Sequence, residues 1–125
     1  MITWKTVRIV GTSYGTRDLR LKELSEMDAG SIRITLSPEP ENQFDPWAIR
    51  VFANEMMIGY IPAKTSPVVL ELLSRGDIRE VELDEIGLWI RNGESYWSAR
   101  IRLGVTLERS TRDHQAQDVA VESAV

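Results

Sequence analysis

The side chains best suited to chemistry lie in residues 39–62, which read EPENQFDPWAIRVFANEMMIGYIP. Within this stretch an aromatic ring and a carboxylate, Phe44 and Asp45, are neighbours in a short polar segment. An exposed aromatic ring can stack on an unpaired base, because every base has a π face. A carboxylate accepts hydrogen bonds from hydroxyl or amide donors. The pair is therefore a candidate binding site, or else the tip of a well-ordered turn.

The residues around this pair predict a loop held between two strands. Two prolines and Asn42 precede it, and these residue types favour turns because they fix the backbone or bond to it. Residues 48–54 then alternate between apolar and polar side chains, which is the pattern of a half-buried strand. Residues 54–55 make a short turn, and residues 56–61 return as a second strand. Ordered structure should thus fix the loop at both ends.

Further strands are predicted on either side of this hairpin. The expected strands are residues 3–10, residues 31–36, residues 78–85 and a long last strand that reaches residue 107. Their inward side chains should include Ile32, Ile34, Leu36, Val81, Leu83, Trp97, Ala99, Ile101, Leu103, Val105 and Leu107, and Tyr96, Ser98, Arg100 and Arg102 should face outward. The apolar phase slips at residues 84–85, which predicts a bulge there. Asn92 and Gly93 tolerate positive φ and predict a tight hairpin turn.

One clear helix is predicted between Ser66 and Gly76. Ser66 suits the N-cap, Pro67 the first helical position and Gly76 the C-terminal stop. Its apolar face, Val69, Leu72 and Leu73, should cover an open end of the sheet. A second, short helix within residues 19–30 would carry Leu21, Leu24 and Met27, if packing stabilises it. Six strands with one or two helices predict a mainly β domain, which we expect to be a small curved barrel.

The composition excludes several classes of protein. A chain of 125 residues without cysteine is expected to form one domain, with no disulfide or thiolate site. The only histidine is His114, no phosphate-binding glycine loop occurs, and we therefore expect neither an enzyme, a metal site nor a cofactor. No segment resembles a signal peptide or membrane helix, so the expected location is the cytoplasm. The net charge of −4 argues against broad binding along nucleic acid but allows a local site.

The central stretch resembles a known family. It contains the pattern Glu-Pro-x-Asn-x-Phe-Asp-x-x-Ala-Ile-x-Val followed by Ile-Gly-Tyr-Ile-Pro, with Val-Gly-x-x-Tyr at residues 10–14 upstream. This arrangement is similar to the HIRAN domain, which occurs alone in bacteria and phages and also fused to DNA-remodelling ATPases. The resemblance covers residues 4–107 and implies a barrel related to the SH3-like and OB groups. We expect the domain to end at residue 108 and residues 109–125 to form a flexible tail.

The resemblance implies binding to the 3′-hydroxyl end of single-stranded DNA, in DNA repair, replication or phage DNA metabolism. The positions that it assigns to this site are Tyr14, Phe44, Asp45 and Trp97. We add Tyr60 of the Ile-Gly-Tyr segment and Lys64, the lysine nearest to the family's basic position. A terminal hydroxyl could donate to Asp45, whereas the phosphate of a continuous strand would be repelled. Family members that bind DNA have basic residues where this chain has Ser13, Pro62 and Ala63. Other cations could compensate if they converge: Arg17, Arg20, Lys22, Lys64, Arg100 and Arg102.

Structural roles are open to the same side chains. Asp45 can fix the turn through backbone hydrogen bonds, and Phe44, Tyr14 and Trp97 can pack in the core. Three further aromatic residues are expected to serve packing: Trp4, Trp47 and Trp89, although Trp47, beside the motif, could line the rim of a pocket. The alternative function is a protein-interaction or regulatory domain that keeps the fold, has lost the DNA site and binds a partner such as a DNA-processing protein. A nuclease is a third reading, which the residue inventory disfavours.

Overall fold

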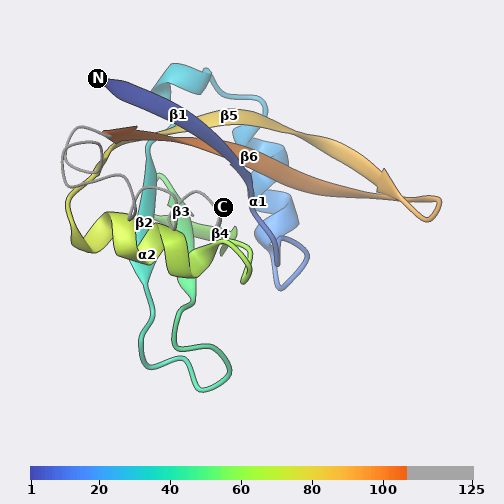
Figure 1. The fold of residues 1–125 in the computed structure, drawn as a ribbon. Helices are drawn as coiled ribbons and strands as arrows, with labels where there is room; N and C mark the ends of the chain where they lie inside the picture. The colour runs from blue at the N-terminus through green and yellow to red at the C-terminus, as the bar shows by residue number, and fades with distance from the viewer. Residues whose placement is uncertain (107–125) are drawn as a thin grey trace.

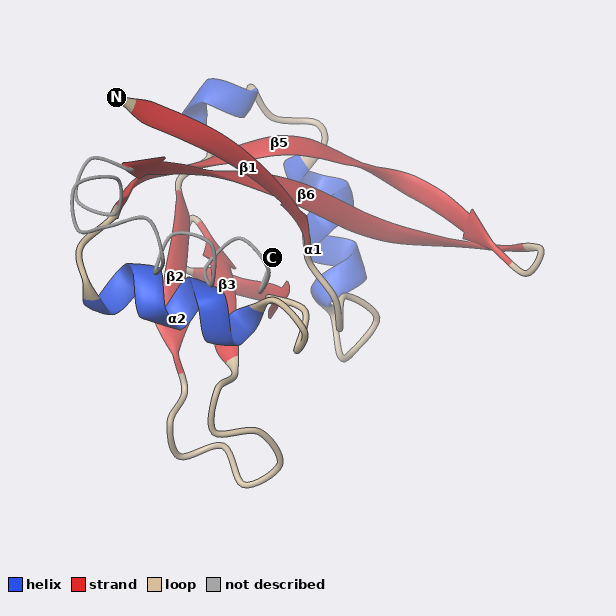
Figure 2. Ribbon diagram, viewed as in Figure 1, coloured by secondary structure: helices blue, strands red, loops and turns tan. Residues whose placement is uncertain are grey.

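The computed structural model describes residues 1–106, which fold into two antiparallel three-stranded sheets and two helices (Figures 1 and 2). The first sheet has the order β1-β6-β5, formed by β1 (Ile2–Arg8), β6 (Glu94–Thr106) and β5 (Ile78–Arg91). The second has the order β2-β3-β4, formed by β2 (Ile34–Pro38), β3 (Ile49–Ala53) and β4 (Met56–Tyr60). The remaining elements are α1 (Arg17–Leu24), a 3-10 turn (Ala29–Ser31) and α2 (Ser66–Ser74).

The predicted mainly β fold with six strands is confirmed. The strands of residues 1–106 form two separate sheets and do not close into one hydrogen-bonded barrel. The predicted domain end at residue 108, the predicted tail over residues 109–125, Leu107 and His114 all lie outside the described residues.

One backbone bridge connects the two sheets. Beyond β1, Ile9 N still donates to Ala99 O at 3.0 Å, and the chain then crosses to the edge of β4. There Val10 N donates to Tyr60 O at 2.8 Å, and Tyr60 N donates to Val10 O at 2.9 Å. This close approach requires glycine at position 59, because a Cβ atom there would lie 2.6 Å from Val10 O. The Ile-Gly-Tyr sequence is thus explained by the joint between the sheets.

The core lies between the two sheets and takes side chains from both helices. Its fully buried members include Ile9, Leu21, Ile49, Val51, Ile58, Val69, Ile101 and Leu103. In β3 the burial alternates as the sequence pattern predicted, with the buried side chains on one face. Ile32 and Ile34 are buried and Leu36 packs against the core, also as predicted.

The short first helix differs from the prediction at its C-terminal end. Leu21 and Leu24 are buried as expected, but Met27 is 45% exposed. The helix ends at Leu24, and Met27 N then donates to Leu24 O at 3.0 Å in a tighter turn. Because that turn is tighter than a helical one, Met27 leaves the face that Leu21 and Leu24 share. The placement of Met27 on this helix was therefore wrong.

The second helix ends as predicted but begins differently. Gly76 has φ +74 and follows the last helical turn, which is the usual place for glycine at a helix end. Ser66 is not the N-cap, because it is itself the first helical residue and Thr65 precedes it. The Ser66 side chain is fully buried, and its Oγ donates to Ala63 O at 3.3 Å.

The hairpin of β5 and β6 extends beyond the end of β1 (Figure 1). Its turn is formed by Asn92 and Gly93 with positive φ, and its bulge lies between Leu83 and Glu85, as predicted. Ser98 was expected to face outward but is buried. The chain just beyond β1 crosses over it, and Ser98 Oγ donates to Ile9 O at 3.4 Å.

Outward side chains on this sheet form ion pairs and stacking contacts. Arg102 bonds Glu82 through Nε and Nη2, at 3.1 and 2.8 Å, and lies 4.5 Å from the centre of the Trp4 ring. Arg100 contacts both Asp84 and Glu85. These two arginines are therefore neutralised by carboxylates of β5.

We predict that Ile34→Ala lowers the free energy of unfolding by about 2–5 kcal/mol, because it leaves a cavity between the sheets. Thr35→Ala, one residue along the same strand and exposed, is the matched control. Denaturant melts measure both. A loss below roughly half a kcal/mol for Ile34→Ala would contradict the described core.

We also predict that Gly59→Ala lowers the free energy of unfolding by about 1–3 kcal/mol, because a methyl group there forces the two sheets apart. Gly87→Ala is the control, since its Cβ would meet nothing closer than the Trp89 ring at 4.0 Å. Equal stability of the two variants in denaturant melts would show that the joint at Val10 is not needed.

Candidate functional site

The loop between β2 and β3 projects from the body of the molecule and is ordered by its own side chains (Figure 1). Asn42 Oδ1 accepts hydrogen bonds from Phe44 N at 2.8 Å and from Asp45 N at 2.9 Å. Asn42 N in turn donates to Glu39 O at 3.0 Å. One side-chain amide therefore fixes the backbone that carries the aromatic ring and the carboxylate.

Asp45 has a structural role and retains an accepting oxygen. Its Oδ1 accepts from Trp47 N at 2.9 Å, and its main-chain oxygen accepts from Ala48 N at 3.0 Å. Its Oδ2 has no hydrogen bond from the described residues. The two roles considered for Asp45, turn former and ligand acceptor, are thus compatible in one side chain.

The tip of the loop presents aromatic surface to solvent. Phe44 is 90% exposed, so the alternative of a core role for Phe44 does not hold. Trp47, which we expected to serve packing, is also exposed. A ring as exposed as that of Phe44 is accessible to a stacking partner.

A second group of side chains meets near the joint between the sheets. Gly11 has φ +71, and a Cβ atom on it would lie 3.5 Å from Arg17 Nη1, 3.7 Å from Tyr60 Cδ1 and 3.8 Å from Tyr14 Cδ2. The Arg17 guanidinium lies 5.6 Å from the centre of the Tyr14 ring and 5.7 Å from that of Tyr60. Tyr14 is nevertheless 69% exposed. It therefore stands at the surface, with Arg17 over its ring.

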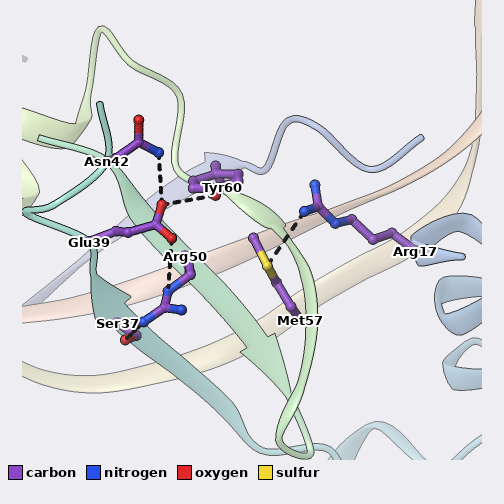
Figure 3. Close-up of polar contacts among 7 residues, drawn as sticks. All are labelled: Arg17, Ser37, Glu39, Asn42, Arg50, Met57 and Tyr60. Carbon is purple, nitrogen blue, oxygen red and sulfur yellow. Dashed lines mark hydrogen bonds and ion pairs between the residues drawn. The ribbon is translucent and has the colours of Figure 1, made fainter. Parts of the chain in front are cut away.

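Glu39 connects the loop to this second group (Figure 3). Its Oε1 accepts from Asn42 Nδ2 at 2.8 Å and from the Tyr60 hydroxyl at 3.0 Å, and its Oε2 lies 3.8 Å from Arg50 Nε. In Figure 3 Tyr60 lies between Glu39 and Arg17. An open hollow of about 680 Å³ is lined by residues that include Glu39, Phe44, Arg50 and Tyr60.

The hydrogen bonds of this cluster shift two pKa values in opposite directions. The pKa of Glu39 is lowered, chiefly because Asn42 donates to its carboxylate, with further help from Tyr60 and the charge of Arg50. The pKa of Tyr60 is raised by burial and by the hydrogen bond that its hydroxyl donates to Glu39. At neutral pH the carboxylate is therefore charged and the phenol is protonated. Sequence reasoning did not assign a role to Glu39, although it opens the central pattern.

Two of the predicted site residues, Lys64 and Trp97, are not among the side chains that contact one another in this cluster. Lys64 is exposed in the segment before α2. Trp97 packs against the core, as the structural alternative proposed. Its main-chain oxygen accepts from Thr12 Oγ1 at 2.7 Å, which anchors the segment that carries Tyr14 to β6. Trp97 thus supports the site through its backbone.

Two further features of the described residues bear on function. Between Met1 and Thr106, no three carboxylate or imidazole groups lie where they could hold a metal ion. No helix in that part of the chain has the length and apolar composition to cross a membrane.

The Glu39 cluster makes a prediction about pH. Its lowered pKa means that the carboxylate contributes stability above its ordinary pKa of 4.5, and that this contribution is lost as the pH falls through the folded-state value. Glu39→Gln should therefore be less stable than the unmodified chain at neutral pH, and the difference should shrink in acid. Denaturant melts along a pH series measure it. A difference that is independent of pH would contradict the ionised cluster.

Comparison with known proteins gives one match. A family model described as the HIRAN domain matches residues 6–111, which is most of the chain. No curated protein and no solved structure gives a significant match. The chain belongs to the HIRAN domain family.

Proposed function

We propose that this chain is a binding module for the 3′-hydroxyl end of single-stranded DNA and that it performs no catalytic step. Nucleic-acid binding is the general function for which HIRAN domains are known. The observation that carries the finer proposal is the pairing of an exposed aromatic ring, Phe44, with a carboxylate, Asp45, on a loop of fixed backbone. The proposed setting is DNA repair, replication or phage DNA metabolism.

The exposed rings supply affinity without sequence preference. Phe44 and Tyr14 are both available to solvent, and stacking of a base on an aromatic ring contributes about 1–3 kcal/mol. The hollow beside Phe44 offers space for a nucleotide next to the stacked one. Because every base has a π face, these contacts should depend little on which base is bound.

Asp45 supplies the preference for an end. A terminal 3′-hydroxyl can donate a hydrogen bond to the carboxylate, whereas an internal linkage has no donor and carries negative charge. Oδ1 is already used by Trp47 N, so Oδ2 is the oxygen for the terminal hydroxyl. The same charge that accepts an end therefore excludes a continuous strand.

A second candidate function is a protein-interaction domain, and the β5–β6 hairpin favours it. Leu88 is 57% exposed and Ile90 is 78% exposed on a hairpin that reaches beyond β1. Exposed apolar residues on a projecting element suit a protein partner better than DNA.

We predict that replacing the 3′-hydroxyl of a short oligothymidylate with a 3′-phosphate weakens binding at least tenfold, or about 1.4 kcal/mol. The phosphate removes a donor and places charge against Asp45. Fluorescence anisotropy at low salt measures both affinities. Equal affinities for the two ends, or no binding by folded protein, would favour the protein-interaction function.

Two variants separate the roles of the loop residues. Asp45→Asn keeps an oxygen for Trp47 N but loses the charge, so it should narrow the difference between the two ends. Phe44→Ala should weaken both ends by a similar factor, because stacking does not depend on the terminus. Leu88→Ala, which shortens an exposed side chain on the distant β5–β6 hairpin, is the control. A Phe44→Ala variant that binds as well as the control would contradict the stacking role.

A further inference from the structure

We propose that Arg17 is the phosphate-binding residue of this site, and that it contacts the phosphodiester next to the nucleotide stacked on Tyr14. This inference rests on the proposed function. That function so far includes base stacking and a carboxylate for the terminal hydroxyl, and Arg17 adds a contact to phosphate. Phosphate contacts position a nucleic acid on a protein, while stacking alone leaves it free to slide.

The guanidinium of Arg17 is held in place from several sides. Its Nη1 donates to Gly11 O at 2.7 Å, and its Nη2 lies 3.5 Å from Met57 Sδ. It also lies over the rings of Tyr14 and Tyr60, at 5.6 and 5.7 Å from their centres. Arginine stacks on aromatic faces in this way, and its planar fork is then already ordered for a phosphate. Little side-chain entropy remains to be lost on binding.

Arg17 still has hydrogen-bond donors to offer. A guanidinium carries five N–H groups, and a thioether sulfur is only a weak acceptor. Within residues 1–106 no carboxylate lies within ion-pair distance of Arg17. Its positive charge is therefore available to a phosphate, with which arginine forms charge-assisted hydrogen bonds.

The other candidate arginines are engaged elsewhere. Arg50 is held by Ser37 and Glu39. Arg20 Nη1 donates to Met57 O at 2.6 Å, and among the described residues Arg20, unlike Arg17, lies over neither tyrosine ring. Arg100 and Arg102 pair with carboxylates on the first sheet. Since Ser13, beside Tyr14, is neutral, Arg17 provides the positive charge at this ring.

The geometry also assigns the two faces of Tyr14 to different partners. Arg17 lies over one face, and the exposure of the ring leaves the other for a base. A base stacked on that face would have its phosphate near the edge of the ring, within reach of the N–H groups of Arg17.

The test pairs a protein variant with a modified DNA. The probe is a short oligothymidylate with a 3′-hydroxyl, whose last phosphodiester is replaced in a second probe by a neutral methylphosphonate. The neutral linkage should weaken binding to the unmodified chain roughly tenfold, the effect of one charge-assisted hydrogen bond. It should have almost no effect on Arg17→Gln, since the partner of that phosphate is gone.

Salt dependence gives a second readout. The slope of log Kd against log salt should fall by about 0.7 in Arg17→Gln, the value for one phosphate contact to a single strand. Arg79→Gln, which removes an exposed charge on β5, is the control and should keep both the slope and the effect of the neutral linkage. Thermal melts check that each variant is folded.

Arg17→Lys keeps the positive charge but loses the planar guanidinium. It replaces Arg17→Gln as the test variant if Arg17→Gln does not fold. It should keep the salt slope and bind the charged probe more weakly. Equal weakening of unmodified and Arg17→Gln protein by the neutral linkage, or full affinity in Arg17→Lys, would overturn the role of Arg17. The preference for a 3′-hydroxyl would stand in that case. Absence of all DNA binding by the unmodified chain would overturn both proposals.

Discussion

The site depends on one contact between backbones, the bridge from Val10 to Tyr60. Two hydrogen bonds of 2.8 and 2.9 Å join the end of the first strand to the edge of the second sheet. Only glycine at position 59 leaves room for them, because a Cβ atom would lie 2.6 Å from Val10 O. The same contact places the segment after Val10 beside Tyr60, so the joint between the sheets is also the base of the proposed site.

From this joint the side chains form a continuous series of contacts. Arg17 lies over both Tyr14 and Tyr60, the Tyr60 hydroxyl donates to Glu39, and Glu39 accepts from Asn42. Asn42 in turn fixes the backbone that carries Phe44 and Asp45. These contacts fix the position of the segment that carries Tyr14 and Arg17 relative to the loop that carries Phe44 and Asp45. Such order before binding reduces the entropy lost when a flexible single strand is bound.

Local patterns in the sequence predicted the local structure well. Alternation identified β3, the Asn92-Gly93 pair identified the long hairpin, and the slip in phase identified its bulge. Errors arose where tertiary contacts decide the outcome. Ser98 alternates as an outward residue but is buried because the chain beyond β1 crosses over it. The chain forms a tighter turn after α1 ends at Leu24, and Met27 is exposed there.

The candidate site was predictable only in part, for a similar reason. The residue types in residues 42–45 predicted a fixed loop, and the structure adds that Phe44 is exposed. The position of Arg17 between two tyrosines depends on the joint between the sheets, which no local pattern encodes. NMR titration of the labelled chain with a 3′-hydroxyl oligothymidylate is the most direct test of the proposed site. If the strand binds there, the amides of Gly11, Tyr14, Phe44, Asp45 and Tyr60 shift together. Shifts confined to the hairpin around Leu88 and Ile90 would contradict the proposed site.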